Sequence, residues 1–332
     1  MRRRALGATG FDVSVIGFGS WQIGGAVGRL GWKSQDDGVS IAAIHAALDA
    51  GVNWIDAAPA YGFGHSEEVV GRALAGMSEP PLVFTKCGIV WDENANQRLD
   101  LSPQSIRREC GDSLRRLDVE VIDLYQFHWP IPDRDLEEAW STIAELQVEG
   151  LVRAIGVSNF TVGQMERAQE VAPIATHQPP YSILDRRIEA DVLPYCADHG
   201  IGVIVYSPLA SGLLGDTISR EGLEADLTDW RHQDPLFQEP HLSEHLAVVT
   251  RLRSIARKRG ATLADVAIAW TLRRDVVAGA IVGFSRPDQI PQAIGGAALE
   301  LTLAEQDEIA RALDELLVSS PPEPRLVPPI PE

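Results

Sequence analysis

The sequence lacks the glycine-rich phosphate loops found in most nucleotide-binding proteins. Although 29 of its 332 residues are glycine, neither GxGxxG nor GxxxxGK[ST] occurs in it, so the usual Rossmann and P-loop cradles are excluded. Basic residues are also few: 29 Lys and Arg stand against 47 Asp and Glu, a net charge of −18. This balance argues against a nucleic-acid-binding protein and against one that binds acidic membrane surfaces, because both rely on basic side chains.

Cysteine and long apolar runs are scarce too. The three cysteines, Cys87, Cys110 and Cys196, form no CxxC pair and are too few for a disulfide framework, which favours reduced thiols and a cytoplasmic location. Three arginines near the N-terminus resemble the start of a signal peptide, but Gly7 and Asp12 interrupt the apolar segment that should follow. No stretch has the length and apolarity of a membrane-spanning helix.

Short apolar runs alternate with longer amphipathic segments along the chain. Eight runs are predicted to be strands, at residues 15–18, 53–56, 82–85, 121–127, 153–157, 174–178, 203–206 and 280–282. Most are continuously apolar, as expected of parallel strands covered by helices on both faces. Eight strand–helix repeats with short connections predict an α/β fold, a closed (β/α)₈ TIM barrel, in a single domain that spans residues 1–332.

Helix ends can also be predicted. Ser102-Pro103 has the form of an N-cap followed by proline at the first helical position. Gly51, Gly150 and Gly200 each stand just before a predicted strand, where glycine ends helices well.

Three segments fall outside the strand–helix alternation. Residues 1–14 are predicted to form an N-terminal hairpin, and residues 211–242 a long loop after the seventh strand. The tail at 321–332 has six prolines in twelve residues, which excludes a helix and favours an extended chain.

Chemically capable side chains occur where predicted strands end. Asp56 ends the second strand, Lys86 follows the third and His128 the fourth, while Tyr61 lies in the loop after Asp56. Taken singly, each has an ordinary structural alternative, such as a helix cap for the aspartate or a packing role for the tyrosine and the histidine. Lys86 is less ordinary, because an ammonium at the end of an apolar strand needs a nearby anion, and Asp56 at the end of the adjacent strand is the obvious one. Since active residues of such barrels collect at the carboxyl ends of strands, we expect an active site there.

Six segments together resemble the aldo-keto reductases. They are NWIDAAPAYG at 53–62, SEE at 66–68, TKCG at 85–88, IDLYQFH at 122–128, IGVSNF at 155–160 and YSPL at 206–209. They occur in the family's order on the expected strands, and the resemblance extends from about Leu6 to Leu316. It implies a barrel that binds NADP(H) without a Rossmann motif and reduces an aldehyde or ketone to an alcohol.

The resemblance implies a catalytic tetrad of Asp56, Tyr61, Lys86 and His128. Tyr61 would give the proton to the substrate oxygen. Because an ordinary phenol has a pKa of about 10, we expect Lys86 to lower the pKa of Tyr61 and Asp56 to keep Lys86 charged. His128 would orient the carbonyl or share in the proton transfer.

The resemblance also implies a cofactor site. Ser158, Asn159 and Gln178 would bind the nicotinamide carboxamide, and Tyr206 would stack on its ring. The other expected cofactor contacts are Ser20, Trp21, Asp56, Ser207, Leu209, Ser211, Gly212, Arg231, Gly283, Ser285, Arg286 and Gln289. Arg286 falls where the family binds the 2′-phosphate, and a guanidinium suits phosphate well. We therefore expect NADPH to be preferred over NADH.

Aromatic residues follow several of the strands. Trp21, Phe63, Trp91 and Trp129 are expected to line the substrate pocket, where they would suit an apolar or sugar-like compound. None of them selects a particular carbonyl substrate, and packing in the interior is an equally good account of each one.

Two further functions compete with a reductase. The family includes barrel subunits of potassium channels, and a redox-sensing NADPH-binding subunit of that kind could keep the whole tetrad. The acidic composition and the lack of an attached interaction segment favour a free enzyme instead. A barrel metal hydrolase is the other alternative, but neither HxH nor HExxH occurs.

Overall fold

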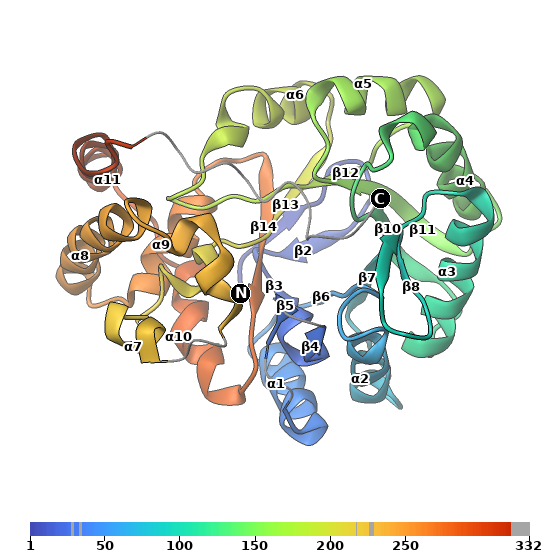
Figure 1. The fold of residues 1–332 in the computed structure, drawn as a ribbon, viewed down its shortest axis with the longest axis horizontal. Helices are drawn as coiled ribbons and strands as arrows, with labels where there is room; N and C mark the ends of the chain where they lie inside the picture. The colour runs from blue at the N-terminus through green and yellow to red at the C-terminus, as the bar shows by residue number, and fades with distance from the viewer. Residues whose placement is uncertain (28–29, 33–34, 217, 226–228, 320–332) are drawn as a thin grey trace.

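Eight parallel strands close into a barrel in the computed structural model, which describes residues 1–27, 30–32, 35–216, 218–225 and 229–319 (Figure 1). In order around the barrel the strands are β3 (Ile16–Gly19), β6 (Trp54–Asp56), β7 (Leu82–Cys87), β10 (Ile122–Phe127), β11 (Val152–Ser158), β12 (Thr176–Gln178), β13 (Gly202–Val205) and β14 (Val277–Gly283). β14 pairs with β3, which completes the closure. The eight predicted strands and the predicted barrel are confirmed, with shifts of a few residues at the strand ends.

Helices surround the barrel, as Figure 1 shows. They are α1 (Asp37–Asp49), α2 (His65–Leu74), α3 (Pro103–Leu117), α4 (Leu136–Val148), α5 (Val162–Val171), α6 (Val192–Asp198), α8 (His241–Arg259), α9 (Leu263–Thr271), α10 (Ile290–Ile294) and α11 (Leu303–Leu316). The predicted N-cap is confirmed, because the Ser102 hydroxyl accepts a hydrogen bond from Ser105 N. The predicted helix-ending glycines, at 51, 150 and 200, all have positive φ, at 94°, 79° and 67°. No helix of the described residues is long and apolar enough to cross a membrane.

The predicted N-terminal hairpin is confirmed and closes the amino-terminal end of the barrel. It pairs β1 (Arg3–Ala5) with β2 (Asp12–Ser14). Its buried side chains Leu6, Phe11 and Val13 form one cluster with side chains of the barrel interior, including Trp54 and Phe84. This plug leaves the carboxyl ends of the strands as the accessible end of the barrel.

Loops at the carboxyl ends carry additional structure that the sequence did not reveal. Two small hairpins, β4 (Ala26–Val27) with β5 (Leu30–Gly31) and β8 (Ile89–Trp91) with β9 (Gln97–Leu99), follow β3 and β7. Strands of two or three residues are too short to show a periodicity. The long loop expected at 211–242 contains the short helix α7 (Arg220–Ala225) and single turns at Trp230–Gln233 and Pro235–Phe237, so it is not irregular throughout. The proline-rich tail lies outside the described residues.

Candidate active site

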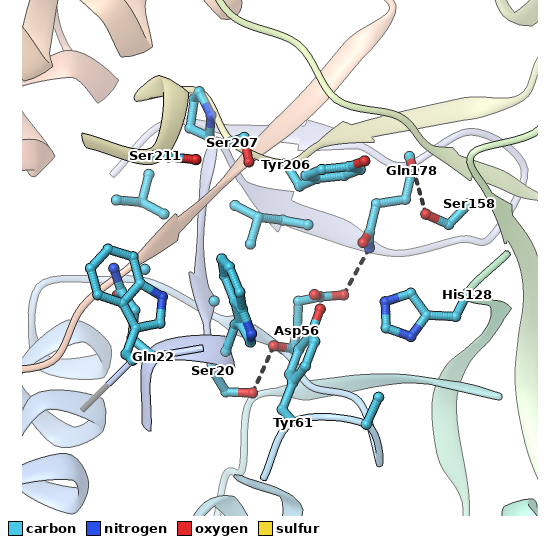
Figure 2. Close-up of a pocket in the computed structure, with 18 of the residues that line it drawn as sticks. Ser20, Gln22, Asp56, Tyr61, His128, Ser158, Gln178, Tyr206, Ser207 and Ser211 are labelled. Carbon is cyan, nitrogen blue, oxygen red and sulfur yellow. Dashed lines mark hydrogen bonds between the residues drawn. The ribbon is translucent and has the colours of Figure 1, made fainter. Parts of the chain in front are cut away.

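A pocket of about 390 Å³ opens at the carboxyl ends of the barrel strands. Its walls include residues that end or follow several strands, among them Ser20, Asp56, His128, Gln178 and Tyr206. Figure 2 shows the side chains of Tyr61, Asp56 and His128 directed toward one space, with Gln178 and Tyr206 on its far side. The barrel thus brings together residues that are far apart in the chain, as predicted.

The buried ammonium of Lys86 has the partner that the sequence predicted. Its Nζ donates to Asp56 Oδ2 at 2.6 Å, to the Ala57 carbonyl at 3.0 Å and to the Tyr61 hydroxyl at 3.3 Å. The side chains of Lys86 and Asp56 are 1% and 3% exposed. Burial lowers the pKa of Lys86, but the contacts with Asp56 and Tyr61 outweigh it and leave that pKa above its ordinary value. Lys86 therefore carries its positive charge at neutral pH.

The pKa of Tyr61 differs from the expectation. Burial raises the pKa of Tyr61 above its ordinary value, and the Lys86 charge opposes this rise without reversing it. The expected lowering of this pKa is therefore wrong for the chain alone, because the burial cost depends on packing that the sequence does not state. Tyr61 keeps its proton at neutral pH, so its hydroxyl is available as a proton donor.

His128 lies next to Tyr61 and is neutral. The two rings are 5.7 Å apart and almost perpendicular, at 83°. Burial and the nearby Lys86 charge hold the pKa of His128 well below its usual value. A neutral imidazole beside a phenol can place two hydrogen-bond donors on one oxygen atom.

The loop that carries Tyr61 turns back sharply onto the pocket. Gly62 and Gly64 have φ values of 67° and 92°, which glycine adopts readily. A Cβ atom at Gly62 would come within 1.9 Å of the Gly24 carbonyl oxygen, so only glycine fits this approach. The fully buried Glu67 then ties the start of α2 to β7 by accepting a hydrogen bond from the Thr85 hydroxyl at 2.6 Å.

Several expected cofactor residues do not themselves line the pocket. In the described parts of the chain these are Arg231, Ser285, Arg286 and Gln289. Arg231 lies directly behind the wall, because it donates to the carbonyl of the lining residue Ser211 at 3.4 Å and forms an ion pair with Asp229. The three residues after β14 form one turn, in which Gln289 Oε1 accepts from the backbone nitrogens of Ser285 and Arg286 at 2.7 and 3.1 Å.

Two of the four expected aromatic residues line the pocket and two do not. Trp21 and Trp129 line the pocket, whereas Phe63 and Trp91 pack against each other with ring centroids 5.5 Å apart and do not appear among the described lining residues. The pocket also has lining residues that the sequence did not single out, namely Gln22, Trp32, Ile89, Gln97, Trp230 and Asp234. They lie on loops and short hairpins, so no periodic pattern could have shown them.

Comparison with known proteins identifies the family. The sequence profile of the Aldo/keto reductase family matches residues 15–314. The chain belongs to the aldo/keto reductase family. It is therefore an oxidoreductase that acts on carbonyl or CH–OH groups, and the family's enzymes use nicotinamide cofactors.

Several members of the aldo/keto reductase family resemble this chain over most of its length. Aldo-keto reductase YhdN of Bacillus subtilis is 40% identical over 87% of both chains. The NADH-specific methylglyoxal reductase of Escherichia coli is 34% identical over 95% of this chain and all of its own. The structure of the glycerol dehydrogenase AKR11B4 from Gluconobacter oxydans has a TM-score of 0.87 and 39% identity, and the match covers 97% of this chain and 98% of that one.

The carboxamide-binding residues expected of an aldo/keto reductase form one hydrogen-bonded group. Gln178 Nε2 donates to Asp56 Oδ1 at 2.8 Å, and the Ser158 hydroxyl donates to the Gln178 carbonyl at 2.7 Å. Asn159 Oδ1 accepts from the Tyr206 hydroxyl at 2.8 Å. These bonds hold amide and hydroxyl groups in place at the pocket wall, where they suit the amide of a nicotinamide.

The segment after β13 suits the phosphates of the same cofactor. Ser207, Ala210, Ser211 and Gly212 all have positive φ, between 46° and 96°. Turns of this kind can direct backbone N–H groups into a concave site for anions, although the Ala210 and Gly212 nitrogens already donate to the Ser207 and Leu209 carbonyls, each at 2.9 Å. Ser207, Ser211 and Gly212 line the pocket. The described residues of this segment therefore fit the phosphates of a dinucleotide.

Proposed function

We propose that this aldo/keto reductase reduces an aldehyde or ketone with NADPH and that Tyr61 supplies the proton. The observation that supports this most directly is the chain of contacts from Asp56 through Lys86 to Tyr61, beside His128, at the pocket. A protonated phenol, a neutral imidazole and a buried ammonium are together the groups that a developing alkoxide requires.

The proton step follows from this geometry. The substrate oxygen would lie between the Tyr61 hydroxyl and the His128 ring, and it would take the Tyr61 proton as negative charge develops on it. Lys86, 3.3 Å from that hydroxyl, would stabilise the phenolate left behind, and Asp56 would keep Lys86 in place and charged. The bound cofactor supplies the hydride.

The relatives' names guide the choice of substrates and cofactors to test. One relative is named for methylglyoxal and NADH, and a structural neighbour is named for glycerol. The pocket combines the aromatic walls of Trp21 and Trp129 with the polar side chain of Gln97. We propose a small, oxygen-rich carbonyl compound as substrate and expect NADPH to be preferred through Arg286. Oxidation of the matching alcohols would use the same groups in reverse.

The test is the Tyr61→Phe variant, assayed by NADPH absorbance against a panel of aldehydes, ketones and keto-sugars. Loss of a general acid lowers turnover by about 10²- to 10⁴-fold, while cofactor binding should stay close to that of the wild type. Tyr195→Phe is the matched control, because Tyr195 bonds Gln169 on the outside of the barrel. Wild-type turnover in Tyr61→Phe would refute the assignment. Cofactor binding without turnover of any compound by the wild type would favour the regulatory alternative.

A further inference from the structure

Glu109 is a buried carboxyl group for which the proposed reaction has no use. It lies on α3 and is 5% exposed. One oxygen, Oε2, accepts a hydrogen bond from Gly88 N at 2.9 Å, and the other, Oε1, shares a hydrogen bond of 3.1 Å with the Ser105 hydroxyl. Among the described ion pairs, none joins Glu109 to a lysine or arginine, although a buried carboxylate ordinarily needs such a partner.

Gly88 is the joint between the catalytic strand and the wall of the pocket. It directly follows β7, which carries Lys86, and directly precedes β8. Its φ of 96° is a glycine conformation, and a Cβ atom there would come within 2.8 Å of Leu101. The Gly88 carbonyl accepts from Asp100 N at 3.2 Å. Glu109 therefore binds the backbone N–H of Gly88, the residue at which the chain leaves the barrel.

The hairpin that begins at this joint reaches the pocket. β8 and β9 pair from Ile89 with Leu99 to Trp91 with Gln97. Both Ile89 and Gln97 line the pocket. A shift at the base of the hairpin would move both of these side chains relative to a bound substrate.

We propose that Glu109 is a positioning residue, which sets the place of the β8–β9 hairpin against the substrate by holding Gly88, and that this hold weakens as the pH rises because a charged carboxyl group is more stable in water than in this buried place. The proposal rests on the proposed function, because it assigns the hairpin to the substrate side of that pocket. Glu109 itself touches neither Tyr61 nor His128 in any described hydrogen bond.

The surroundings of Glu109 make it titrate near neutral pH. Burial raises the pKa of this carboxyl to about 8, although the bonds from Gly88 and Ser105 oppose the rise. The charged and titratable groups that face it are Asp100 from the preceding loop, Arg108 from its own helix, Cys87 from β7 and Tyr125 from β10. Asp100 raises the pKa further, and Arg108 lowers it.

The sign of the pH effect follows from linkage. Below pH 8 the buried carboxyl is neutral, whereas a carboxyl exposed to water is charged above its ordinary pKa of 4.5. Between these two values each further pH unit favours arrangements that expose Glu109 by up to about tenfold, and above pH 8 the effect levels off because both arrangements are charged. Because exposure breaks the bond to Gly88, we expect the hairpin to loosen as the pH rises from 4.5 toward 8.

The experiment compares KM and kcat from pH 4.5 to above pH 8 in the wild type, Glu109→Gln and Glu109→Ala. A glutamine can accept from Gly88 N and donate to Ser105 without ionising, so it should keep KM low at all pH values. The wild type should show a KM that rises between pH 4.5 and pH 8 and levels off above it, and Glu109→Ala a raised KM throughout, with kcat changed much less in both. Glu166→Gln, on the exposed face of α5, is the control.

Hydrogen exchange of the peptide 88–101 gives a second measurement that does not depend on turnover. At one alkaline pH this peptide should exchange faster in the wild type than in Glu109→Gln, and the helices should exchange alike. Equal exchange in the two proteins, or a KM that rises equally in both, would overturn the proposal. If Glu109→Ala does not fold, the comparison of wild type with Glu109→Gln still decides. If the wild type reduces no carbonyl compound, the exchange result stands by itself and only the proposed function fails.

Discussion

The Asp56→Asn variant tests the buried charge pair at the centre of the proposed site. The substitution keeps the shape of the side chain and removes its negative charge. Lys86 would then retain only neutral partners, the Ala57 carbonyl at 3.0 Å and the Tyr61 hydroxyl at 3.3 Å, besides the new amide. With 1% of the Lys86 side chain exposed, water cannot replace the lost carboxylate.

The expected loss of stability can be worked out from this geometry. Removing one partner of a buried pair lowers the free energy of unfolding by about 3–5 kcal/mol, because the other charge stays behind without compensation. Lys86 can escape part of this cost by releasing its proton, since burial lowers its pKa once Asp56 no longer opposes it. A lysine whose pKa is lowered in the fold destabilises the protein most at low pH. The free energy of unfolding of the variant should therefore increase as the pH rises. In the wild type the raised pKa of Lys86 stabilises the fold, and this stabilisation is lost only at alkaline pH.

The assay is urea unfolding at several pH values in a double-mutant cycle with Lys86→Met. Each single variant leaves one buried charge unpaired, and the double variant leaves none, so the double variant should be more stable than the sum of the single losses implies. Additive losses would refute the reasoning, as would an Asp56→Asn protein as stable as the wild type at neutral pH. Either result would mean that the pair does not hold two opposite charges.

Two further substitutions probe the cofactor and the barrel. Arg286 is exposed and pairs with Asp288 at 3.0 Å, so Arg286→Ala should weaken NADP⁺ binding by roughly tenfold or more and leave NAD⁺ binding unchanged. Calorimetric titration measures the affinity for each cofactor. Arg134→Ala is the control, because Arg134 is exposed and lies beside Asp135. Equal losses of NADP⁺ and NAD⁺ affinity in Arg286→Ala would place the 2′-phosphate elsewhere. Gly17→Ala should destabilise the barrel by about 1–3 kcal/mol or more in urea unfolding, because the new Cβ would meet the Trp54 ring at 2.3 Å. Gly163→Ala should not destabilise the protein, because the space around Gly163 is open. Equal stability of the Gly17→Ala and Gly163→Ala variants would contradict the packing argument.

Most of the barrel could be predicted because the same strand–helix pattern repeats along the sequence. Most of the eight strands are apolar runs that alternate with helices, so a weak run such as β12, Thr176–Gln178, can be placed by its position in the alternation. The residues at the strand ends followed from the same order. Asp56 and Lys86 were predicted to meet because adjacent parallel strands bring their last residues together, and they do.

The pKa of Tyr61, the contact of Glu109 and the short hairpins depend on tertiary packing, which no local sequence pattern shows. The pKa of Tyr61 results from burial opposed by one charge, and the balance depends on packing from several elements. Glu109 looks like any helical glutamate in the sequence, because nothing nearby shows that its helix face meets the Gly88 turn. The hairpins that complete the pocket consist of strands of two or three residues, too short to distinguish from loops.

The N-terminal hairpin has a consequence for how the chain is synthesised and folds. It is synthesised before every barrel strand, yet Arg4 donates to the Val277 carbonyl at 2.6 Å, 273 residues later in the chain. Leu6 and Val13 pack against side chains of β13 and β14 in the barrel interior. These contacts cannot form until the last barrel strand has been made, and contacts of such long sequence separation slow folding. The final closure of the barrel must therefore follow synthesis of β14, with the apolar face of the hairpin exposed until then.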